Sequence, residues 1–403
     1  MRPPMWIVGF AALACAQPGF AQTQKNYGPG VTDMEIKIGQ TMPFSGPASS
    51  FGLNGRVEAA YFRMINEKGG VNGRKINLIA LDDAFSPPKT VEQTRKLVEG
   101  EEVLAIVGTI GTAGNIAISK YLNSNKVPQL LVATASSKLN DPANLPWTTA
   151  FYLSAENEAR IYARWLLKNK PGARIGVLYQ NDDFGKGYLE GLRRGLDDKA
   201  SAMIVKEISY DLAYPTVDSQ ILQLHASGAD TLFHAAIPKF SAQALNRSNE
   251  LGWKPLHLIV AAAAATIVRM DQVGGDRAKG VVSGLYLKDT SDPAWDSDSA
   301  THKFRAFVKD FASDTPLNDP GVVMGYSVGE ITVEILKRCG NDLTRENLLK
   351  QATNVKDLQL SMFIPNVKVN ISPEDRAAWK QAQMVQFDGK QWVAIGDILG
   401  TED

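Results

Sequence analysis

The sequence predicts an α/β protein built from two doubly wound domains with parallel sheets. Short apolar segments with the character of strands alternate with amphipathic helical segments, and this alternation occurs twice along the chain. A length of 403 residues exceeds what one hydrophobic core usually organises. No Gly/Ser linker or low-complexity tract separates the two runs. We therefore expect two lobes joined by several short chain crossings.

The first run of elements is expected to begin near Glu35. Its strands are predicted at Glu35–Gly39, Lys75–Leu81, Val103–Val107 and Pro128–Val132. Its helices are predicted at Gly55–Glu67, Thr90–Glu99 and Asn115–Asn123. Val103–Val107 is wholly apolar, which is typical of a strand buried on both faces of a parallel sheet.

The second run begins near Leu153. Its helices are predicted at Glu156–Lys168, Gly185–Lys199, Thr216–Ser227 and Phe240–Leu251. Its strands are predicted at Arg174–Tyr179, Met203–Ile208, Thr231–Ala235 and Leu256–Val260. Beyond it we expect a crossover strand at Gly280–Leu287, helices at Ala300–Ala312 and Gly325–Arg338, and a hairpin turning at Asp388-Gly389.

The N-terminus has the pattern of a secretory signal peptide. A basic start at Arg2 precedes the apolar run Met5–Ala16, which is too short to cross a bilayer. Small residues at Gly19 and Ala21 suit cleavage after Ala21, so residues 1–21 are the predicted signal and the mature protein is expected in the periplasm. Lipoprotein processing at Cys15 is the weaker alternative.

Composition argues against several functional classes. Lys plus Arg and Asp plus Glu each number 43, so the zero net charge does not favour a nucleic-acid partner. The four histidines lack metal-ligand spacing, and the two cysteines, Cys15 and Cys339, cannot form a Cys-rich site. We find no nucleotide-binding or nucleophile motif. The sequence therefore favours a protein that is not an enzyme and needs no metal or cofactor.

Two turns at predicted strand ends are the best candidates for a ligand site. Val103–Val107 leads into the Gly/Thr turn 108–114, where Thr112 is expected to be the N-cap of the next helix. The following strand ends in the small, hydroxyl-bearing segment 133–137. Open α/β sheets bind ligands at the carboxyl ends of strands, and a helix start favours an anion. Two ordinary capped turns are the competing interpretation, and Asp82-Asp83 and Asp182-Asp183 are expected to be turn and capping residues.

These features occur together with short motifs spread over nearly the whole chain. The motifs are Ile36–Gly39, Ser45–Pro47 with Gly52, Gly69–Arg74, Asp82-Asp83, Val107-Gly108, Phe184–Gly187, Gly274–Asp276 with Gly280, and Phe387–Lys390. In this order they resemble the Leu/Ile/Val-binding-protein-like class of type I periplasmic binding proteins, the receptors of branched-chain-amino-acid ABC transporters. The resemblance implies two lobes that close on a small ligand, joined by three crossings.

The resemblance also implies lobe boundaries and site residues. Lobe 1 would comprise residues 34–152 and 286–362, and lobe 2 residues 153–285 and 363–403. Thr112 and the turn after the next strand would hold a ligand carboxylate, while Phe51 and Phe184 would cover the ligand from either lobe. The expected ligand-binding set is Phe51, Thr112, Ala133, Thr134, Ala135, Tyr152, Phe184, Ala236 and Ala263.

Two departures from the family pattern stand out. Amino-acid-binding members carry an acidic residue that pairs with the ligand ammonium, and Ala263 occupies that position in the run 261–265. A buried ammonium without a counter-charge costs several kcal/mol, although Glu156 is an alternative acid. The family's first-lobe disulfide is also missing, because its positions fall on Phe85 and Gly111, so packing must hold that turn.

The sequence therefore predicts a monomeric periplasmic receptor that delivers a small organic carboxylate to an ABC permease. An aromatic acid, a 2-oxo acid or a short fatty acid would fit better than an amino acid. Two alternatives remain open: a receptor for a branched-chain or other amino acid, and a ligand-sensing subunit of a regulatory system.

Overall fold

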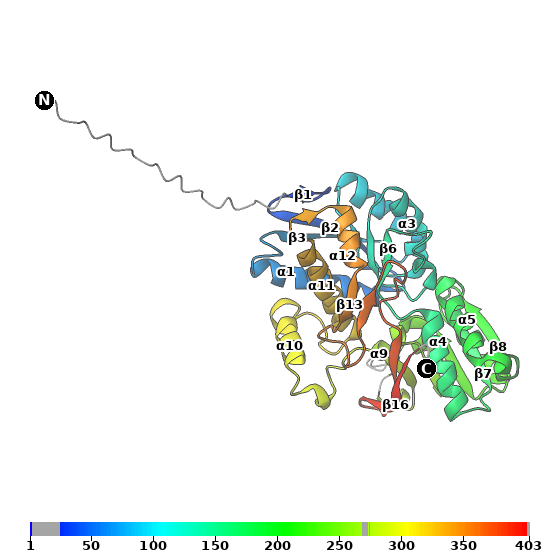
Figure 1. The fold of residues 1–403 in the computed structure, drawn as a ribbon. Coiled ribbons are helices and arrows are strands. Elements are labelled where there is room, and N and C mark those ends of the chain that lie inside the picture. The colour runs from blue at the N-terminus through cyan, green and yellow to red at the C-terminus, as the bar shows by residue number, and fades with distance from the viewer. Residues whose placement is uncertain (2–24, 268–272, 274, 401–403) are drawn as a thin grey trace.

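The computed structural model describes Met1 and residues 25–267, 273 and 275–400, and it has the predicted α/β class with two main sheets (Figure 1). The predicted signal peptide and Cys15 lie outside the described residues, apart from Met1. None of the helices in the described part of the chain is long and apolar enough to span a bilayer.

The first sheet has five parallel strands in the order β3-β2-β4-β5-β6. Its strands are β2 (Glu35–Met42), β3 (Lys75–Asp82), β4 (Ile106–Val107), β5 (Gln129–Val132) and β6 (Thr148–Ala150). This order reverses direction between β2 and β4, which is the topological switch point of a doubly wound sheet. The regular part of β4 is shorter than predicted, although all of Val103–Val107 is buried.

The second sheet repeats this order and adds a hairpin. Its order is β16-β15-β11-β10-β9-β7-β8, in which β8 to β11 are parallel and the last two strands antiparallel. Its strands are β7 (Ile175–Gln180), β8 (Ile204–Tyr210), β9 (Thr231–Ala235), β10 (Leu256–Ile259), β11 (Val282–Leu285), β15 (Gln381–Phe387) and β16 (Trp392–Gly400). The predicted hairpin is confirmed, but residues 388–391 form a longer connection than two residues.

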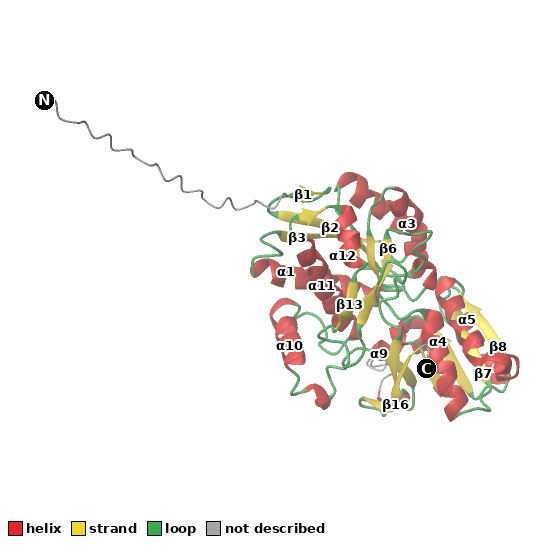
Figure 2. Ribbon diagram, viewed as in Figure 1, coloured by secondary structure: helices red, strands yellow, loops and turns green. Residues whose placement is uncertain are grey.

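Helices flank both sheets (Figure 2). In the first half of the chain these are α1 (Gly52–Glu67), α2 (Pro87–Arg95), α3 (Thr112–Ser124), α4 (Ala155–Asn169), α5 (Asp183–Leu196) and α6 (Ala200–Met203). They continue with α7 (Asp218–Ala226), α8 (Pro238–Glu250), α9 (Ala261–Ile267), α10 (Ser299–Phe311), α11 (Pro320–Cys339) and α12 (Arg345–Ala352). Cys339 is buried at the end of α11, and this burial raises the pKa of its thiol to about 12, as expected of an inert packed residue.

Several short elements were not predicted. The fold begins before Glu35, because β1 (Asn26–Tyr27) pairs with β12 (Asp342–Leu343). The alanine run after β10 forms the helix α9. β13 (Val355–Leu358) and β14 (Val369–Ile371) pair with each other across the predicted lobe boundary at residue 362. The exact lobe boundaries therefore stay a prediction.

Three chain segments cross between the two sheets and meet around one tryptophan. The segments that follow β11 and precede β14 pair by backbone hydrogen bonds, from Lys288 N to Met362 O at 2.9 Å and from Ile364 N to Tyr286 O at 3.0 Å. The Trp379 ring lies 5.1, 5.0 and 4.9 Å from the ring centroids of Phe151, Tyr286 and Phe363. These three neighbours belong to three different crossings. Each crossing is thus fixed by aromatic packing as well as by chain connectivity.

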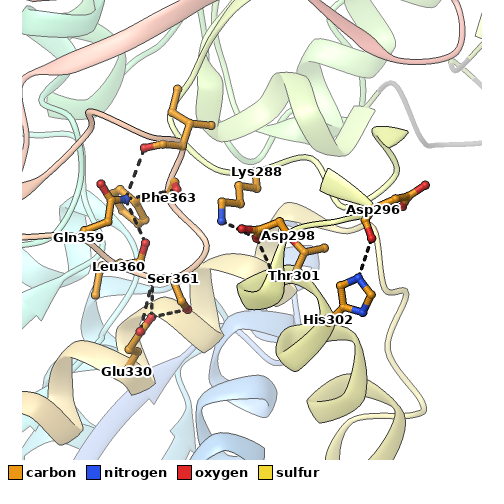
Figure 3. Close-up of polar contacts among 11 residues, drawn as sticks. Lys288, Asp296, Asp298, Thr301, His302, Glu330, Gln359, Leu360, Ser361 and Phe363 are labelled. Atoms are coloured by element: carbon orange, nitrogen blue, oxygen red, sulfur yellow. Dashed lines mark hydrogen bonds and ion pairs between the residues drawn. The ribbon is translucent and has the colours of Figure 1, made fainter. Parts of the chain in front are cut away.

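Side chains tie the same crossings to the helices of the first lobe. Glu330 of α11 accepts hydrogen bonds from the backbone N and Oγ of Ser361, at 3.1 and 2.8 Å. Lys288, on the neighbouring crossing, donates to Asp298 at the start of α10, at 2.7 Å (Figure 3). The first contact joins a crossing to the middle of α11, and the second joins a crossing to the start of α10.

Trp379→Ala is expected to lower the free energy of unfolding by about 3–5 kcal/mol, because the side chain is only 2% exposed and four ring contacts, to Phe151, Tyr152, Tyr286 and Phe363, would be lost. Trp379→Phe is the matched control. Its loss should be smaller, since the indole Nε1 has no hydrogen-bond partner among the described residues. Urea unfolding followed by circular dichroism measures both. A loss below about 1 kcal/mol for the alanine variant would contradict the central role of this side chain.

Candidate functional site

The carboxyl ends of strands from both sheets converge on one cavity of about 440 Å³. Segments that follow β3, β4 and β5 form one wall, and segments that follow β7, β9 and β10 form the other. The lining residues are Phe51, Phe85, Ile110, Gly111, Thr112, Ala133, Thr134, Ala135, Tyr152, Gln180, Phe184, Ile237 and Ala262. Both switch points therefore face the same space, which is of a size typical for a small ligand.

Two glycines shape the turn between β4 and α3. Gly108 has φ +67°, and a Cβ there would lie 2.5 Å from the buried carboxylate of Glu58. Gly111 has φ +104°, and a Cβ there would lie 2.5 Å from the Phe85 ring. Only glycine fits both positions. The positions of the missing disulfide, Phe85 and Gly111, are thus in direct contact, and packing replaces the bond as predicted.

The hydroxyls of Thr112 and Thr134 lie 2.8 Å apart at the end of this turn. Thr134 Oγ1 also accepts from the backbone N of Ser136 at 3.1 Å. When Thr134 donates to Thr112, the Thr112 proton is free to point at a ligand in the cavity. Thr112 is the first residue of α3 and not its N-cap, since Gly111 holds that position without a capping side chain. The helix start therefore keeps N–H groups that can bind a carboxylate.

Phe85 reaches the cavity from a strained turn. Ala84 and Phe85 have φ +49° and +58°, a conformation that non-glycine residues rarely adopt. The side chains of Asp82 and Asp83 accept from the backbone N of Ala84 and Phe85 at 3.0 and 2.9 Å. The predicted turn role of this acidic pair is confirmed. Phe85 in turn lies 6.4 Å from Phe51, ring centroid to centroid, so two aromatic rings cover this side of the cavity.

The second wall presents neutral groups. Gln180 ends β7, and its amide is held by Asp182 at 2.6 Å and by the Tyr210 hydroxyl at 3.0 Å. Asp182 caps α5 by accepting from the backbone N of Phe184 at 3.0 Å, as expected, while burial raises the pKa of this carboxyl. The Phe184 ring leans on Tyr188, with 5.2 Å between ring centroids.

The structure brings together seven of the nine predicted ligand-binding residues. Ala236 and Ala263 are both fully buried and do not line the cavity, which corrects their predicted placement. Their neighbours Ile237 and Ala262 line it instead. For Ala262 and Ala263 the reason is local geometry. Residue 261 starts a helix, and successive residues of a helix point about 100° apart.

Two acids lie close to this wall without lining it. Glu158 is buried and accepts hydrogen bonds from Tyr162 Oη, Tyr188 Oη and the backbone N of Ala261, at 2.6, 2.7 and 2.6 Å. Burial raises the pKa of Glu158, and its three donors hold it beneath α9. Glu156, the alternative partner for an ammonium, accepts from Ser137 Oγ at 2.7 Å. Among the described residues, no aspartate or glutamate lines the cavity.

Within the described ranges, no group of three or more His, Cys, Asp or Glu side chains is arranged to hold a metal ion. His234 and His257 contact each other at 2.9 Å inside the second sheet, and burial lowers the pKa of both rings. They are packed residues.

The sequence model of a family described as periplasmic binding protein matches residues 35–391. The chain belongs to the periplasmic binding protein family. Members of this family are receptors of ABC-type transporters, which bind a small molecule and deliver it to a permease. The relatives and solved structures below place this binding protein in the type I, branched-chain-amino-acid-type class.

Relatives and solved structures agree over most of the chain. Leu/Ile/Val-binding protein homolog 7 of Brucella suis biovar 1 (strain 1330) is 26% identical over 343 residues, covering 81% of this chain and 82% of the relative. A branched chain amino acid ABC transporter structure from Thermus thermophilus with bound valine has a TM-score of 0.80 at 16% identity, covering 92% of this chain and 97% of that one. A fatty acid ABC transporter substrate-binding protein from Thermomonospora curvata has a TM-score of 0.77 at 21% identity, covering 93% and 95%. At these identities the two structures show a shared fold.

Six lining residues of this binding protein were not predicted as ligand contacts: Phe85, Ile110, Gly111, Gln180, Ile237 and Ala262. Gln180 and Ile237 follow β7 and β9 directly, so the strand-end rule that pointed to Thr112 could have found them. Ile110 and Gly111 lie in the predicted Gly/Thr turn, of which only Thr112 was expected to contact the ligand. Phe85 reaches the cavity because Ala84 and Phe85 both have positive φ angles. Neither position is a glycine, so the sequence gives no signal of this backbone conformation.

Thr112→Ala is expected to weaken binding of a carboxylate ligand by about 1–2 kcal/mol, roughly 5- to 30-fold in Kd, because one hydrogen bond to a charged group is lost. Thr112→Ser keeps the hydroxyl and should bind within about twofold of the unaltered protein. Isothermal calorimetry with the tightest-binding acid of a small panel measures both. Unchanged affinity in the alanine variant would remove Thr112 from the binding site.

Proposed function

We propose that this protein is a periplasmic solute receptor that binds a small organic carboxylate between its lobes and delivers it to an ABC permease. One observation carries the proposal: one wall offers an uncapped helix start with paired threonine hydroxyls, and no acidic residue among those described lines the opposite wall. Residues 1–21 would direct export, and the mature receptor would act as a monomer. Phe51, Tyr152 and Phe184 would cover the ligand.

Electrostatics favours an anion over a zwitterion in this cavity. The N–H groups at the start of α3 and the Thr112 hydroxyl stabilise negative charge. An ammonium would need a carboxylate partner, since a buried unpaired charge costs several kcal/mol. Glu156 and Glu158, the acids nearest the second wall, are engaged by Ser137 and by the α9 start. The second wall offers the Gln180 amide and the Phe184 ring instead.

An amino-acid ligand is the second candidate. The relatives are named Leu/Ile/Val-binding proteins, and one structural neighbour holds valine. Another neighbour is named for fatty acid transport, so names alone support both classes. In addition, Oε2 of Glu156 is buried and has no hydrogen-bond partner among the described residues. A rearrangement of that side chain would be required to reach the cavity.

Matched ligand pairs distinguish the two candidates. Leucine and 4-methyl-2-oxopentanoate share a carboxylate and a side chain, and they differ in the group on the α-carbon; phenylalanine and phenylpyruvate form a second pair. We expect the oxo acids to raise the melting temperature and the amino acids to leave it unchanged, because only ligands that prefer the native state stabilise it. Calorimetry should then give at least about a tenfold preference. Tighter binding of either amino acid would refute the carboxylate proposal.

Ala262→Asp is expected to weaken carboxylate binding at least about tenfold, because it places a negative charge on the wall that faces the ligand. Ala262→Asn is the matched control, since the amide has nearly the same size and no charge. The two variants should differ mainly at low ionic strength, where charge repulsion is least screened. Equal affinities of the two variants would show that residue 262 does not face the ligand.

A further inference from the structure

A second cavity, of about 790 Å³, adjoins the first. Phe51, Tyr152 and Ala262 line both spaces, so the two cavities meet at these three side chains. The second cavity extends away from the Thr112 hydroxyl, toward the crossing that follows β11. We call it the rear chamber. The site described above accounts for none of its remaining residues.

The rear chamber has apolar wall segments. Ala261 and Ala264 of α9, Leu285 and Tyr286 at the end of β11, Val323 of α11, and Val385 and Trp392 of the hairpin contribute them. Tyr286 packs edge-on against Tyr152, with 6.3 Å between ring centroids, which places an aromatic ring on each side of the passage. Such a surface suits hydrocarbon or aromatic groups.

Polar groups also line the rear chamber, from Ser50 and Asn54 beside Phe51 to Lys288, Asp289 and Thr290 on the crossing after β11. Lys288 lies there with its side chain 8% exposed, and its ammonium is 2.7 Å from the carboxylate of Asp298 (Figure 3). The same ammonium lies 5.2 Å from the centroid of the Trp295 ring. Two carboxylates, of Asp289 and Asp319, also line this chamber. Asp289 accepts hydrogen bonds from the backbone N and Oγ of Ser291 at 3.0 and 2.6 Å, and Asp319 accepts from the backbone N of Gly321 at 2.7 Å. The protein thus engages each of these charged groups itself.

We propose that the rear chamber holds the apolar tail of the ligand, so that the natural ligand is an elongated monocarboxylate with an alkyl or arylalkyl chain. This inference rests on the proposed function, because it takes the carboxylate to be held at Thr112. The carboxylate then occupies the first cavity, and the chain passes between Phe51 and Tyr152. A compact acid would leave the rear chamber without a ligand group.

A series of straight-chain acids from butanoate to decanoate tests the length requirement by calorimetry. Each methylene that enters the rear chamber should lower Kd about fourfold, the effect of burying one CH₂ group. The gain should stop once the chamber is filled. Affinity that stays flat, or falls with length, would overturn the tail site.

Filling the rear chamber from the protein side gives an independent test. Leu285→Trp places a large ring in this chamber, because Leu285 lines it and does not line the first cavity. Ser50→Trp does the same from the other lobe, should the first variant fold poorly. Val393→Trp is the matched control, since Val393 is 42% exposed and lines neither cavity.

A plugged chamber should lower the affinity for octanoate at least about tenfold and leave that for butanoate within about twofold. The control should bind both as the unaltered protein does. An equal loss for both acids in the two plugging variants would overturn the inference. If the protein binds short acids but not long ones, the tail site is refuted and the proposed function stands. If it binds amino acids but no simple acid, the proposed function itself is refuted.

Discussion

The packing of three chain crossings around Trp379 is the constraint on which the binding site depends. Phe151, Tyr286 and Phe363 belong to different crossings, and each places its ring against the same indole. The residues next to them, Tyr152 and Leu287, line the cavities. The same aromatic cluster therefore joins the lobes and lies next to the cavities. A movement of one lobe relative to the other would shift residues that line them.

Strand order then determines what the joined lobes present to each other. In both sheets the strand order reverses direction next to the first strand of the sheet. In both, the segments that follow the strands on either side of this point line the cavity. The two walls nevertheless differ chemically. The glycine turn leaves the start of α3 uncapped, whereas Asp182 caps α5 with its own side chain. One topology used twice thus yields one wall with an uncapped helix start and one wall whose helix start is capped.

The sequence predicted much of this arrangement, because long amphipathic helices and apolar strands carry strong periodic signals. Turns such as Gly108–Gly111 were visible from their glycines and from the strand-end rule. The strand pairs β1 with β12 and β13 with β14 could not be predicted from the sequence. Strands of two to four residues have no measurable period, and their partners lie elsewhere in the chain. The alanine run 261–265 offers no landmark for aligning one position against another, so the sequence alone does not distinguish Ala262 from Ala263.

The difference between the walls also bears on how the lobes close. An anion held at Thr112 meets no opposite charge among the described residues of the second wall, so charge pairing cannot drive closure. The free energy of closure must then come from removing apolar surface from water, at Phe184, Ile237 and Ala262 on one side and Phe51 and Phe85 on the other. Such a contribution grows with the apolar area of the ligand and depends little on its head group. Under the proposed function, the carboxylate would therefore define the ligand class, and the shape and length of the apolar part would select within it.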